Sequence, residues 1–136
     1  MTGNDVIETT LRVRYSETDA MGVVYHTNFI IWFEVGRGEY MRQKGGSYHE
    51  SFEAKGFFLP VTEVKARFLA PARYGDLVTV RTSVAELRSR SMTFAYEVLM
   101  KETGQVLATG HTKHICVDGE GQITRIPQEV RELLSR

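Results

Sequence analysis

An acidic segment and a Tyr-His pair lie close together near the beginning of the chain. Residues 15–29 read YSETDAMGVVYHTNF, with carboxylates at Glu17 and Asp19 and the pair at Tyr25 and His26. Carboxylate and imidazole side chains can transfer protons, and a carboxylate can also attack an electrophilic carbon. The apolar segment that follows predicts a helix, whose first N–H groups have no partner within the helix and can hold an anion. The stretch therefore gathers groups that acid–base or nucleophilic chemistry requires.

Each of these residues also has a purely structural interpretation. Asp19 could stabilise a turn, because Asp side chains often accept hydrogen bonds from the backbone of a turn. His26 could serve the start of the helix by hydrogen bonding, and Thr27 or Asn28 could cap it. We expect Glu17 to be solvated or engaged in a salt bridge rather than to take part in the chemistry.

A strand precedes the motif and a long helix follows it. Residues 7–15 alternate between the two faces of a half-buried strand. The helix is expected to begin at residues 27–28 and to end near residues 45–46, where two glycines occur. Its apolar stripe consists of Phe29, Phe33, Gly36 and Tyr40. Because Gly36 has no side chain, another backbone could come close to the helix at this position.

The remainder of the chain is dominated by strands. Alternating patterns predict strands near residues 63–70, 78–84, 92–100 and 105–117, with turns at 74–76 and 102–104. A second short helix is expected within 47–56, and Pro127 opens a short C-terminal helix. Because the connections are short, we expect the four strands to form an antiparallel meander. The predicted fold is α+β, a five-stranded antiparallel sheet around one long helix, in a single domain over residues 1–136.

The composition excludes several classes of protein. The chain has 136 residues and no net charge at pH 7, so it can bury a core but gives no sign of a basic nucleic-acid-binding surface. Cys116 is the only cysteine, which rules out an intrachain disulfide and a cysteine-based zinc site. His111 and His114 would face opposite sides of a strand and make a poor metal pair. The beginning of the chain does not resemble a signal peptide, and no apolar run could cross a membrane, so we expect a cytoplasmic protein.

The motif in residues 15–42 resembles the signature of hot-dog-fold acyl-CoA thioesterases. The match is to the 4-hydroxybenzoyl-CoA thioesterase group, including short bacterial thioesterases associated with the Tol-Pal system. The shared pattern is an acidic run that ends in Asp19, the segment Gly-Val-Val-Tyr-His at 22–26, and a helix that begins near Asn28 and Phe29. The later segments FLAPARYGD, SRSMTFAYEV and TGHTKHICVD also resemble parts of this family, in the expected order.

The resemblance implies roles for the residues of the motif. Asp19 would attack the thioester carbonyl directly or activate water as a general base, and the residues alone do not choose between these. Backbone N–H groups at the helix start would hold the oxyanion, with the N–H of His26 as the best candidate. The His26 side chain could polarise the carbonyl or orient Asp19, Tyr25 could line the pocket, and Asn28 could position the site. The resemblance implies no metal and no organic cofactor.

Coenzyme A carries phosphates, which basic residues should contact. In relatives such residues lie on strands and turns at the sheet edge, often across a subunit boundary. The first candidates are Arg88, Arg90 and Ser91 in the turn 88-RSRS-91, followed by Arg67 and Arg73. An exposed basic turn without a specific role is an equally good interpretation of each.

The resemblance also implies an assembly and leaves two other functions open. Hot-dog subunits pair into a continuous sheet, so we expect a homodimer or homotetramer that binds acyl-CoA between subunits. The first alternative is an acyl-CoA dehydratase or hydratase of the same fold, although the order of the acid and the His favours hydrolysis. The second is a non-catalytic acyl-CoA-binding module. The acyl group, and whether CoA or an acyl carrier protein donates it, are not specified by the sequence.

Overall fold

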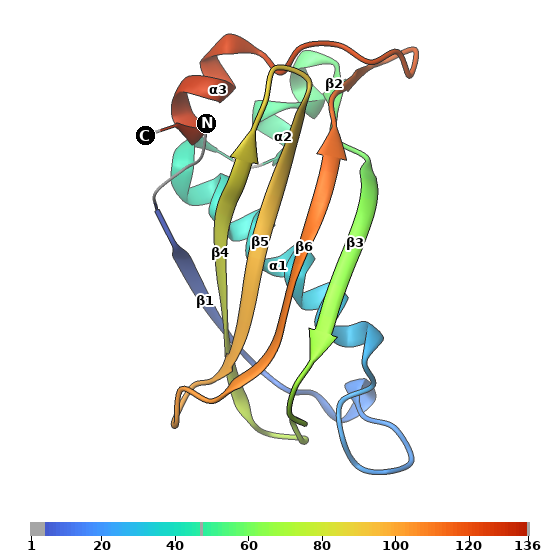
Figure 1. Ribbon diagram of the computed structural model, residues 1–136, viewed down its shortest axis with the longest axis vertical. Coiled ribbons are helices and arrows are strands. Elements are labelled where there is room, and N and C mark those ends of the chain that lie inside the picture. Colours follow the sequence, from blue (N-terminus) through green and yellow to red (C-terminus); the bar gives the residue numbers. More distant parts are fainter. Residues whose placement is uncertain (1–4, 47, 136) are drawn as a thin grey trace.

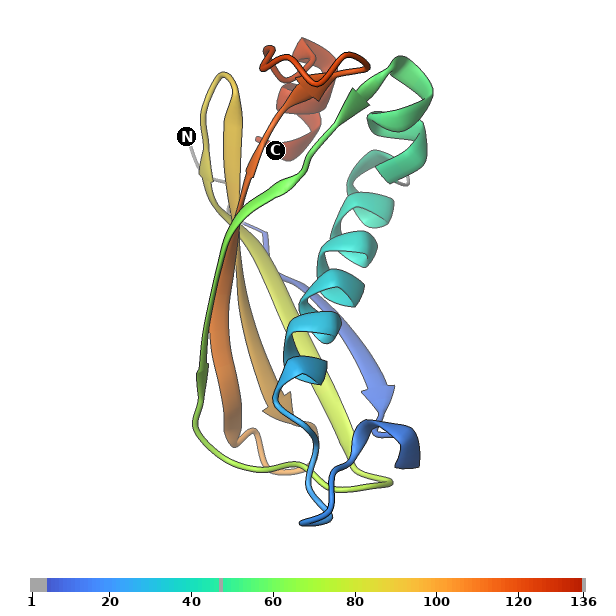
Figure 2. The ribbon, with the colours of Figure 1, turned by 90° about the vertical axis from the view of Figure 1, so that its right-hand side faces the viewer.

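A curved antiparallel sheet wraps around one long helix in the computed structural model, which describes residues 5–46 and 48–135 (Figure 1). The five strands run in the order β1-β4-β5-β6-β3. Their bounds are β1 Ile7–Arg12, β3 Val61–Phe68, β4 Leu77–Leu87, β5 Ser91–Met100 and β6 Val106–Ile115. The helix α1 (Thr27–Gly45) lies against the concave face, as the side view shows (Figure 2). The predicted α+β architecture is therefore confirmed.

The stripe of α1 packs into the sheet as its spacing predicts. Phe29, Phe33, Gly36 and Tyr40 are all buried. Gly36 faces β4, where a Cβ atom would lie 2.3 Å from Oγ1 of Thr82 and 2.8 Å from Cγ1 of Val80. The close neighbours are thus side chains of β4 rather than a backbone. The helix ends at Gly45, and Gly46 follows with a φ of 130°, so the predicted end is also confirmed.

The strand that precedes the motif is shorter than its alternation suggests. β1 ends at Arg12, and residues 15–17 form a 3₁₀ turn, η1 (Tyr15–Glu17), in which Tyr15 is 76% exposed. The prediction that the strand extends to residue 15 is therefore wrong. Val13 donates its N–H to the carbonyl of Asp76 at 2.8 Å and accepts the N–H of Gly75 at 3.0 Å, so the chain stays beside the segment before β4 as far as Val13.

The predicted four-stranded meander is also wrong in one respect. β4, β5 and β6 do form a meander, but β3 pairs with β6 instead of β4 and becomes an edge of the sheet. The connecting residues 69–76 cross the lower end of the sheet, where Ala72 accepts a hydrogen bond from Val24 at 2.8 Å. A connection of this length permits either topology, so the sequence alone could not distinguish them.

Short elements cover the upper end of the helix and sheet. They are α2 (Tyr48–Ser51), η2 (Glu53–Lys55), the paired strands β2 (Phe57–Phe58) and β7 (Val117–Asp118), and α3 (Gln128–Leu134). The helical segment predicted within 47–56 is found, except that Ser47 lies outside the described residues. Pro127 precedes α3 as predicted, and α3 packs its buried Val130 and Leu134 against this end. Within the described ranges, no helix is both long and apolar enough to cross a membrane.

Candidate active site at the start of the long helix

Asp19 organises a tight turn in the loop that leads into α1. Its carbonyl accepts the N–H of Gly22 at 2.9 Å, and its own N–H donates to the carbonyl of Val23 at 2.9 Å. The side-chain Oδ1 accepts the N–H of Met21 at 2.9 Å. Gly22 supplies the left-handed backbone, with a φ of 78°. The structural role considered for Asp19 is thus present, while its second oxygen, Oδ2, forms no hydrogen bond with any described residue.

Glu17 fastens this loop to the helix. Its carboxylate is almost completely buried, with 5% of the residue exposed. Oε2 accepts the indole N–H of Trp32 at 2.8 Å, and Oε1 accepts the backbone N–H of Arg14 at 2.7 Å. Oε1 also lies 3.5 Å from Nε of Arg14. The predicted salt bridge is confirmed, but the alternative of a solvated carboxylate is wrong because the loop folds back over the first turns of α1.

The same residue anchors the helix start through its backbone. The carbonyl of Glu17 accepts the N–H of Tyr25 and the side-chain amide of Asn28, both at 2.9 Å. Neither Asn28 nor Thr27 caps α1, because the N-cap residue is His26, which makes no side-chain capping bond. The capping prediction is therefore wrong, and Asn28 serves instead as a tie between helix and loop. The N–H groups of His26 and Thr27 donate to no acceptor within 5–46 or 48–135, as expected for the first turn of a helix.

An open groove of about 310 Å³ adjoins these unpaired N–H groups. It is lined by Val24, His26, Phe29, Phe68, Leu69, Ala70 and Pro71. The ring of His26 lies 5.6 Å from that of Phe68 in an edge-to-face contact and 4.6 Å from that of Tyr25. Tyr25 itself is 48% exposed and does not line the groove. The lining of the groove is thus apolar except for His26, whose backbone N–H is unpaired among the described residues.

Asp19 stands next to the groove rather than on its surface. Thr18 and Val24 form a β-bridge on either side of the Asp19 turn, and Val24 lines the groove. The structure therefore brings His26 to the groove, with the ring of Tyr25 tilted beside it. Asp19 is half-buried and is joined to this wall through one β-bridge.

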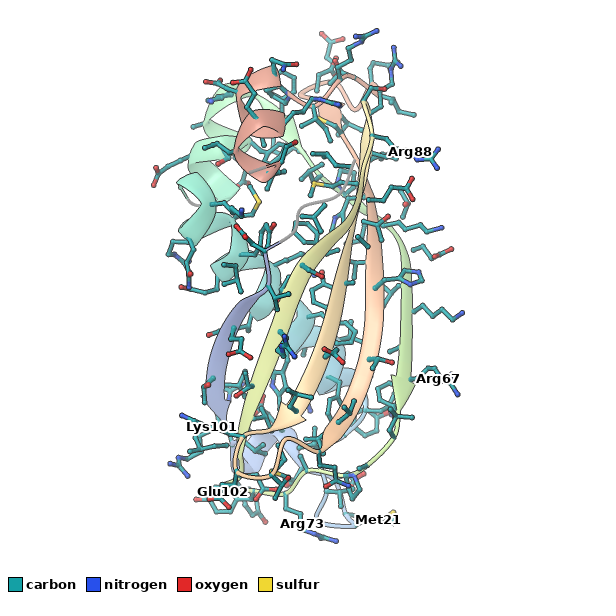
Figure 3. All side chains as sticks on the ribbon, turned by 60° about the vertical axis from the view of Figure 1, so that its left-hand side comes forward. Met21, Arg67, Arg73, Arg88, Lys101 and Glu102 are labelled. Atoms are coloured by element: carbon teal, nitrogen blue, oxygen red, sulfur yellow. The ribbon has the colours of Figure 1, made fainter. Side chains whose placement is uncertain are left out.

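The predicted CoA-binding residues lie elsewhere in the chain. The turn between β4 and β5 holds Arg88, Arg90 and Ser91 at the upper end of the sheet, whereas Arg73 and Met21 lie at the lower end (Figure 3). Arg88 pairs with Glu86, and its N–H donates to the carbonyl of Ser91 at 2.9 Å. Arg67 is exposed on the edge strand β3. Within one chain, none of these five residues lines the groove.

Comparisons with known proteins agree with this architecture. The family model described as "Thioesterase-like superfamily" matches residues 13–134. A putative acyl-CoA thioesterase of Bacillus subtilis is 34% identical over 110 residues, which cover 81% of this chain and 78% of the relative.

Two solved structures superpose closely. A hypothetical protein of Thermus thermophilus is 43% identical with a TM-score of 0.89, covering 94% of this chain and 96% of its own. A DHNA-CoA thioesterase of Staphylococcus aureus is 31% identical with a TM-score of 0.88. The match covers 94% of this chain and 87% of the Staphylococcus aureus chain. Both sequence and fold confirm the resemblance, and the chain belongs to the thioesterase-like superfamily with the hot-dog fold.

Proposed function

We propose that the protein hydrolyses acyl-CoA thioesters to the free acid and CoA at the groove beside the start of α1. The observation that carries the proposal is the unpaired N–H of His26 at the rim of an apolar groove. The Bacillus subtilis relative is named a putative acyl-CoA thioesterase, and the Staphylococcus aureus protein a DHNA-CoA thioesterase. An apolar groove suits an acyl group, and free N–H groups suit its carbonyl oxygen.

The oxyanion would form at the helix start. When a nucleophile adds to the thioester carbon, negative charge develops on the carbonyl oxygen. The free N–H groups of His26 and Thr27 point outward at the positive end of the dipole of α1, so they can stabilise that charge. The His26 ring, held between Tyr25 and Phe68, would orient or polarise the carbonyl. Tyr25 does not line the groove and would act through the ring of His26, beside which it lies.

Asp19 would drive the addition with its free oxygen. Because Oδ1 is occupied by Met21, Oδ2 is the atom available for chemistry. In one route Asp19 takes a proton from water while the water oxygen bonds to the thioester carbon. In the other, Asp19 attacks the carbon itself, and water then hydrolyses the mixed anhydride. Both routes release CoA as the thiol and need no metal or organic cofactor.

A second copy of the chain would complete the site. The edge strand β3 exposes Val61, Val64 and Phe68, and the neighbouring face of α1 exposes Ile31 and Val35. An unpaired edge flanked by apolar side chains favours pairing with another chain. If β3 paired in antiparallel fashion with β3 of a second copy, the two copies would point in opposite directions. The turn 88–91 of the second copy would then lie at the same end as the groove of the first. Arg88, Arg90 and Ser91 could then bind the phosphates of CoA from across the interface, with Arg67 beside them.

The decisive experiment replaces Asp19 by Asn. Asn retains an oxygen that can accept the N–H of Met21, so the fold should survive while the base or nucleophile is lost. With a panel of acyl-CoA thioesters and a thiol reagent, the expected loss in kcat/KM is about 10²- to 10⁴-fold. The thermal midpoint should stay within about 2 °C of the wild type, because a small ΔΔG moves it little.

Asp118→Asn is the matched control for this variant. Asp118 forms a turn with the same backbone–backbone hydrogen bonds, and its side chain likewise accepts the N–H two residues ahead. This turn lies at the far end of the molecule, so replacing Asp118 should leave activity unchanged. Equal activity of Asp19→Asn and wild type would rule out the assignment of Asp19. Release of no CoA by wild type from any thioester of the panel would overturn the proposed hydrolysis.

A further inference from the structure

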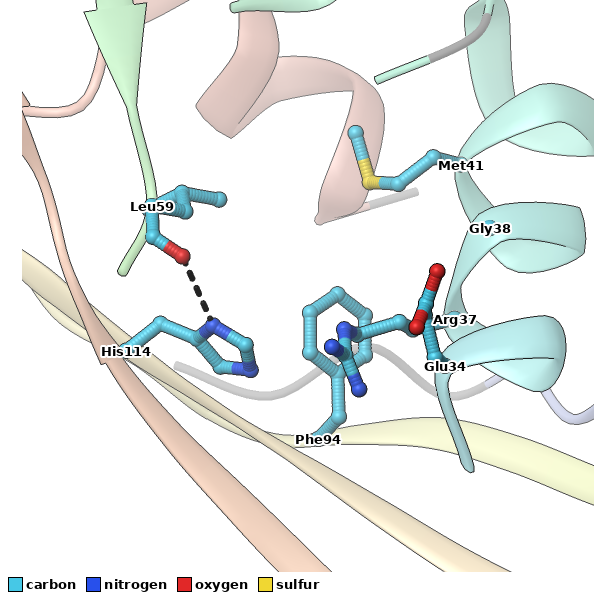
Figure 4. A pocket seen from close by; sticks show the side chains of 7 residues that line it. All are labelled: Glu34, Arg37, Gly38, Met41, Leu59, Phe94 and His114. Carbon is cyan, nitrogen blue, oxygen red and sulfur yellow. Dashed lines mark hydrogen bonds between the residues drawn. The ribbon is translucent and has the colours of Figure 1, made fainter. Parts of the chain in front are cut away.

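A second cavity lies beside the middle of α1, between the helix and the sheet (Figure 4). Its volume is about 280 Å³, and it is lined by Glu34, Arg37, Gly38, Met41, Leu59, Phe94 and His114. A helix rises about 1.5 Å per residue, so Arg37 lies about 16 Å along the axis from His26. The cavity shares no lining residue with the groove at the helix start.

His114 in the wall of the cavity belongs to a hydrogen-bonded chain whose direction can be deduced. The carbonyl of Leu59 can only accept, so Nδ1 of His114, at 3.1 Å, carries the hydrogen (Figure 4). Nε2 of His114 then accepts from the hydroxyl of Thr112 at 2.8 Å. The oxygen of Thr112 in turn accepts the hydroxyl hydrogen of Tyr96 at 2.6 Å. Burial lowers the pKa of His114, which keeps the imidazole neutral near pH 7.

Arg37 brings a positive charge to this cavity without a matching anion. Arg37 is partly buried, and its one hydrogen bond to a described residue is from Nη1 to the Tyr96 hydroxyl at a long 3.5 Å. No carboxylate of a described residue lies within ion-pairing distance of it. The positive charge of Arg37 also lowers the pKa of His114, in addition to the larger effect of burial. The two side chains therefore interact electrostatically across the cavity. Glu34 is exposed at the rim and makes no ion pair with Arg37 in the described part of the chain.

The remaining walls are apolar. Met41 and Phe94 are buried, and Leu59 closes the side next to the imidazole. Partial removal from water makes an unpaired guanidinium unfavourable, and a carboxylate would relieve this with charge-assisted and often bidentate hydrogen bonds. A ligand that combines a carboxylate with an apolar body would therefore match the charge of Arg37 and the surface beside it.

We propose that this cavity is a second binding site, for a small carboxylate with an apolar body. The carboxylate binds the guanidinium of Arg37, and the apolar body rests against Phe94, Met41 and Leu59. His114 supplies a rigid, uncharged wall. The site is separate from the groove at the helix start, so its occupancy does not depend on whether the protein hydrolyses thioesters.

Isothermal titration calorimetry with benzoate and its neutral counterpart benzamide tests the proposal. Wild-type protein should bind benzoate more tightly than benzamide. Arg37→Gln should weaken benzoate binding about tenfold or more, because a charged hydrogen-bonding partner is lost, and should change benzamide binding less than about twofold. Glu34→Gln should strengthen benzoate binding several-fold, because a neighbouring negative charge is removed. Absence of benzoate binding to wild type would overturn the proposal.

Three further variants separate local charge from folding and from the other site. Arg37→Lys keeps the charge without the planar fork and should retain more benzoate affinity than Arg37→Gln. Arg42→Gln removes an exposed charge from the same helix and should leave binding unchanged. Asp19→Asn should also leave benzoate binding unchanged. Loss of binding in Asp19→Asn, or equal loss in Arg42→Gln and Arg37→Gln, would place the anion elsewhere and contradict the proposal.

Discussion

Two turns of this protein share one backbone design but have very different surroundings. In the first, Asp19 accepts the N–H of Gly22 and donates its own N–H to Val23. In the second, Asp118 accepts from Gly121 at 3.0 Å and donates to Gln122 at 2.9 Å. Each Asp side chain also accepts a backbone N–H two residues ahead, each final Gly has a φ near 80°, and a β-bridge flanks each turn. Both turns have the pattern Asp-x-x-Gly.

The two turns differ in the elements that surround them. The second turn lies at the upper end of the molecule, opposite the first (Figure 1). The first turn is followed directly by the helix start and is fixed to α1 by the buried carboxylate of Glu17. The two turns have the same backbone hydrogen bonds, but the first also lies next to a helix N-terminus and an apolar groove, and a chemical role requires such surroundings in addition to the turn.

The largest expected effect comes from removing the anchor that only the first turn has. Glu17→Ala would leave the buried indole N–H of Trp32 without an acceptor and should lower the free energy of unfolding by about 2–3 kcal/mol. Because the helix start would shift relative to the loop, kcat/KM should also fall about tenfold or more. Urea denaturation and thioester hydrolysis measure the two effects.

Glu17→Gln provides the internal comparison for this prediction. Its remaining carbonyl oxygen can still accept from Trp32, so it should be more stable than Glu17→Ala. If both variants were as stable as the wild type, the difference drawn between the two turns would not hold.

A smaller effect should be shared by both turns. Gly22 and Gly121 have φ values of 78° and 80°, and an added Cβ at either would meet no atom closer than 3.8 Å. Each Gly→Ala change should therefore destabilise the protein by a similar amount, about 1–2 kcal/mol, through backbone strain alone. Thermal unfolding measures this, and a clear inequality would show that the turns are not equivalent. Only Gly22→Ala should reduce hydrolysis.

The smallest effect distinguishes the side chains of the two turns. Oδ1 of Asp118 accepts two backbone N–H groups, from Glu120 at 2.9 Å and Gln122 at 3.0 Å, whereas Oδ1 of Asp19 accepts one. Asp118→Ala should therefore destabilise by about 1 kcal/mol, and Asp19→Ala by less. Chemical denaturation of the two variants in parallel gives the order. The opposite order would mean that Asp19 has a stabilising partner beyond its own turn.

Features with a short-range cause were predictable from the sequence. The helix stripe and the Asp-Gly turn follow from periodicity and from backbone preferences, which the sequence displays directly. The neighbour of β3 and the burial of Glu17 depend on how distant segments pack, and neither has a local signal. The single Trp32 offered one clue, because a buried indole N–H usually finds an acceptor. The cavity beside Arg37 likewise arises only when α1 meets β5 and β6.

The crossing of residues 69–76 beneath the sheet also affects how the chain matures. Val24 binds Ala72, and Val23 bridges to Arg73, so the loop that carries Asp19 is completed by a segment made much later in synthesis. When only residues 5–46 of a nascent chain have left the ribosome, residues 69–76, which hold this loop in place, have not yet been made. Domains generally fold as units, and here the region proposed for chemistry must wait for the crossover to emerge before it can take its final shape.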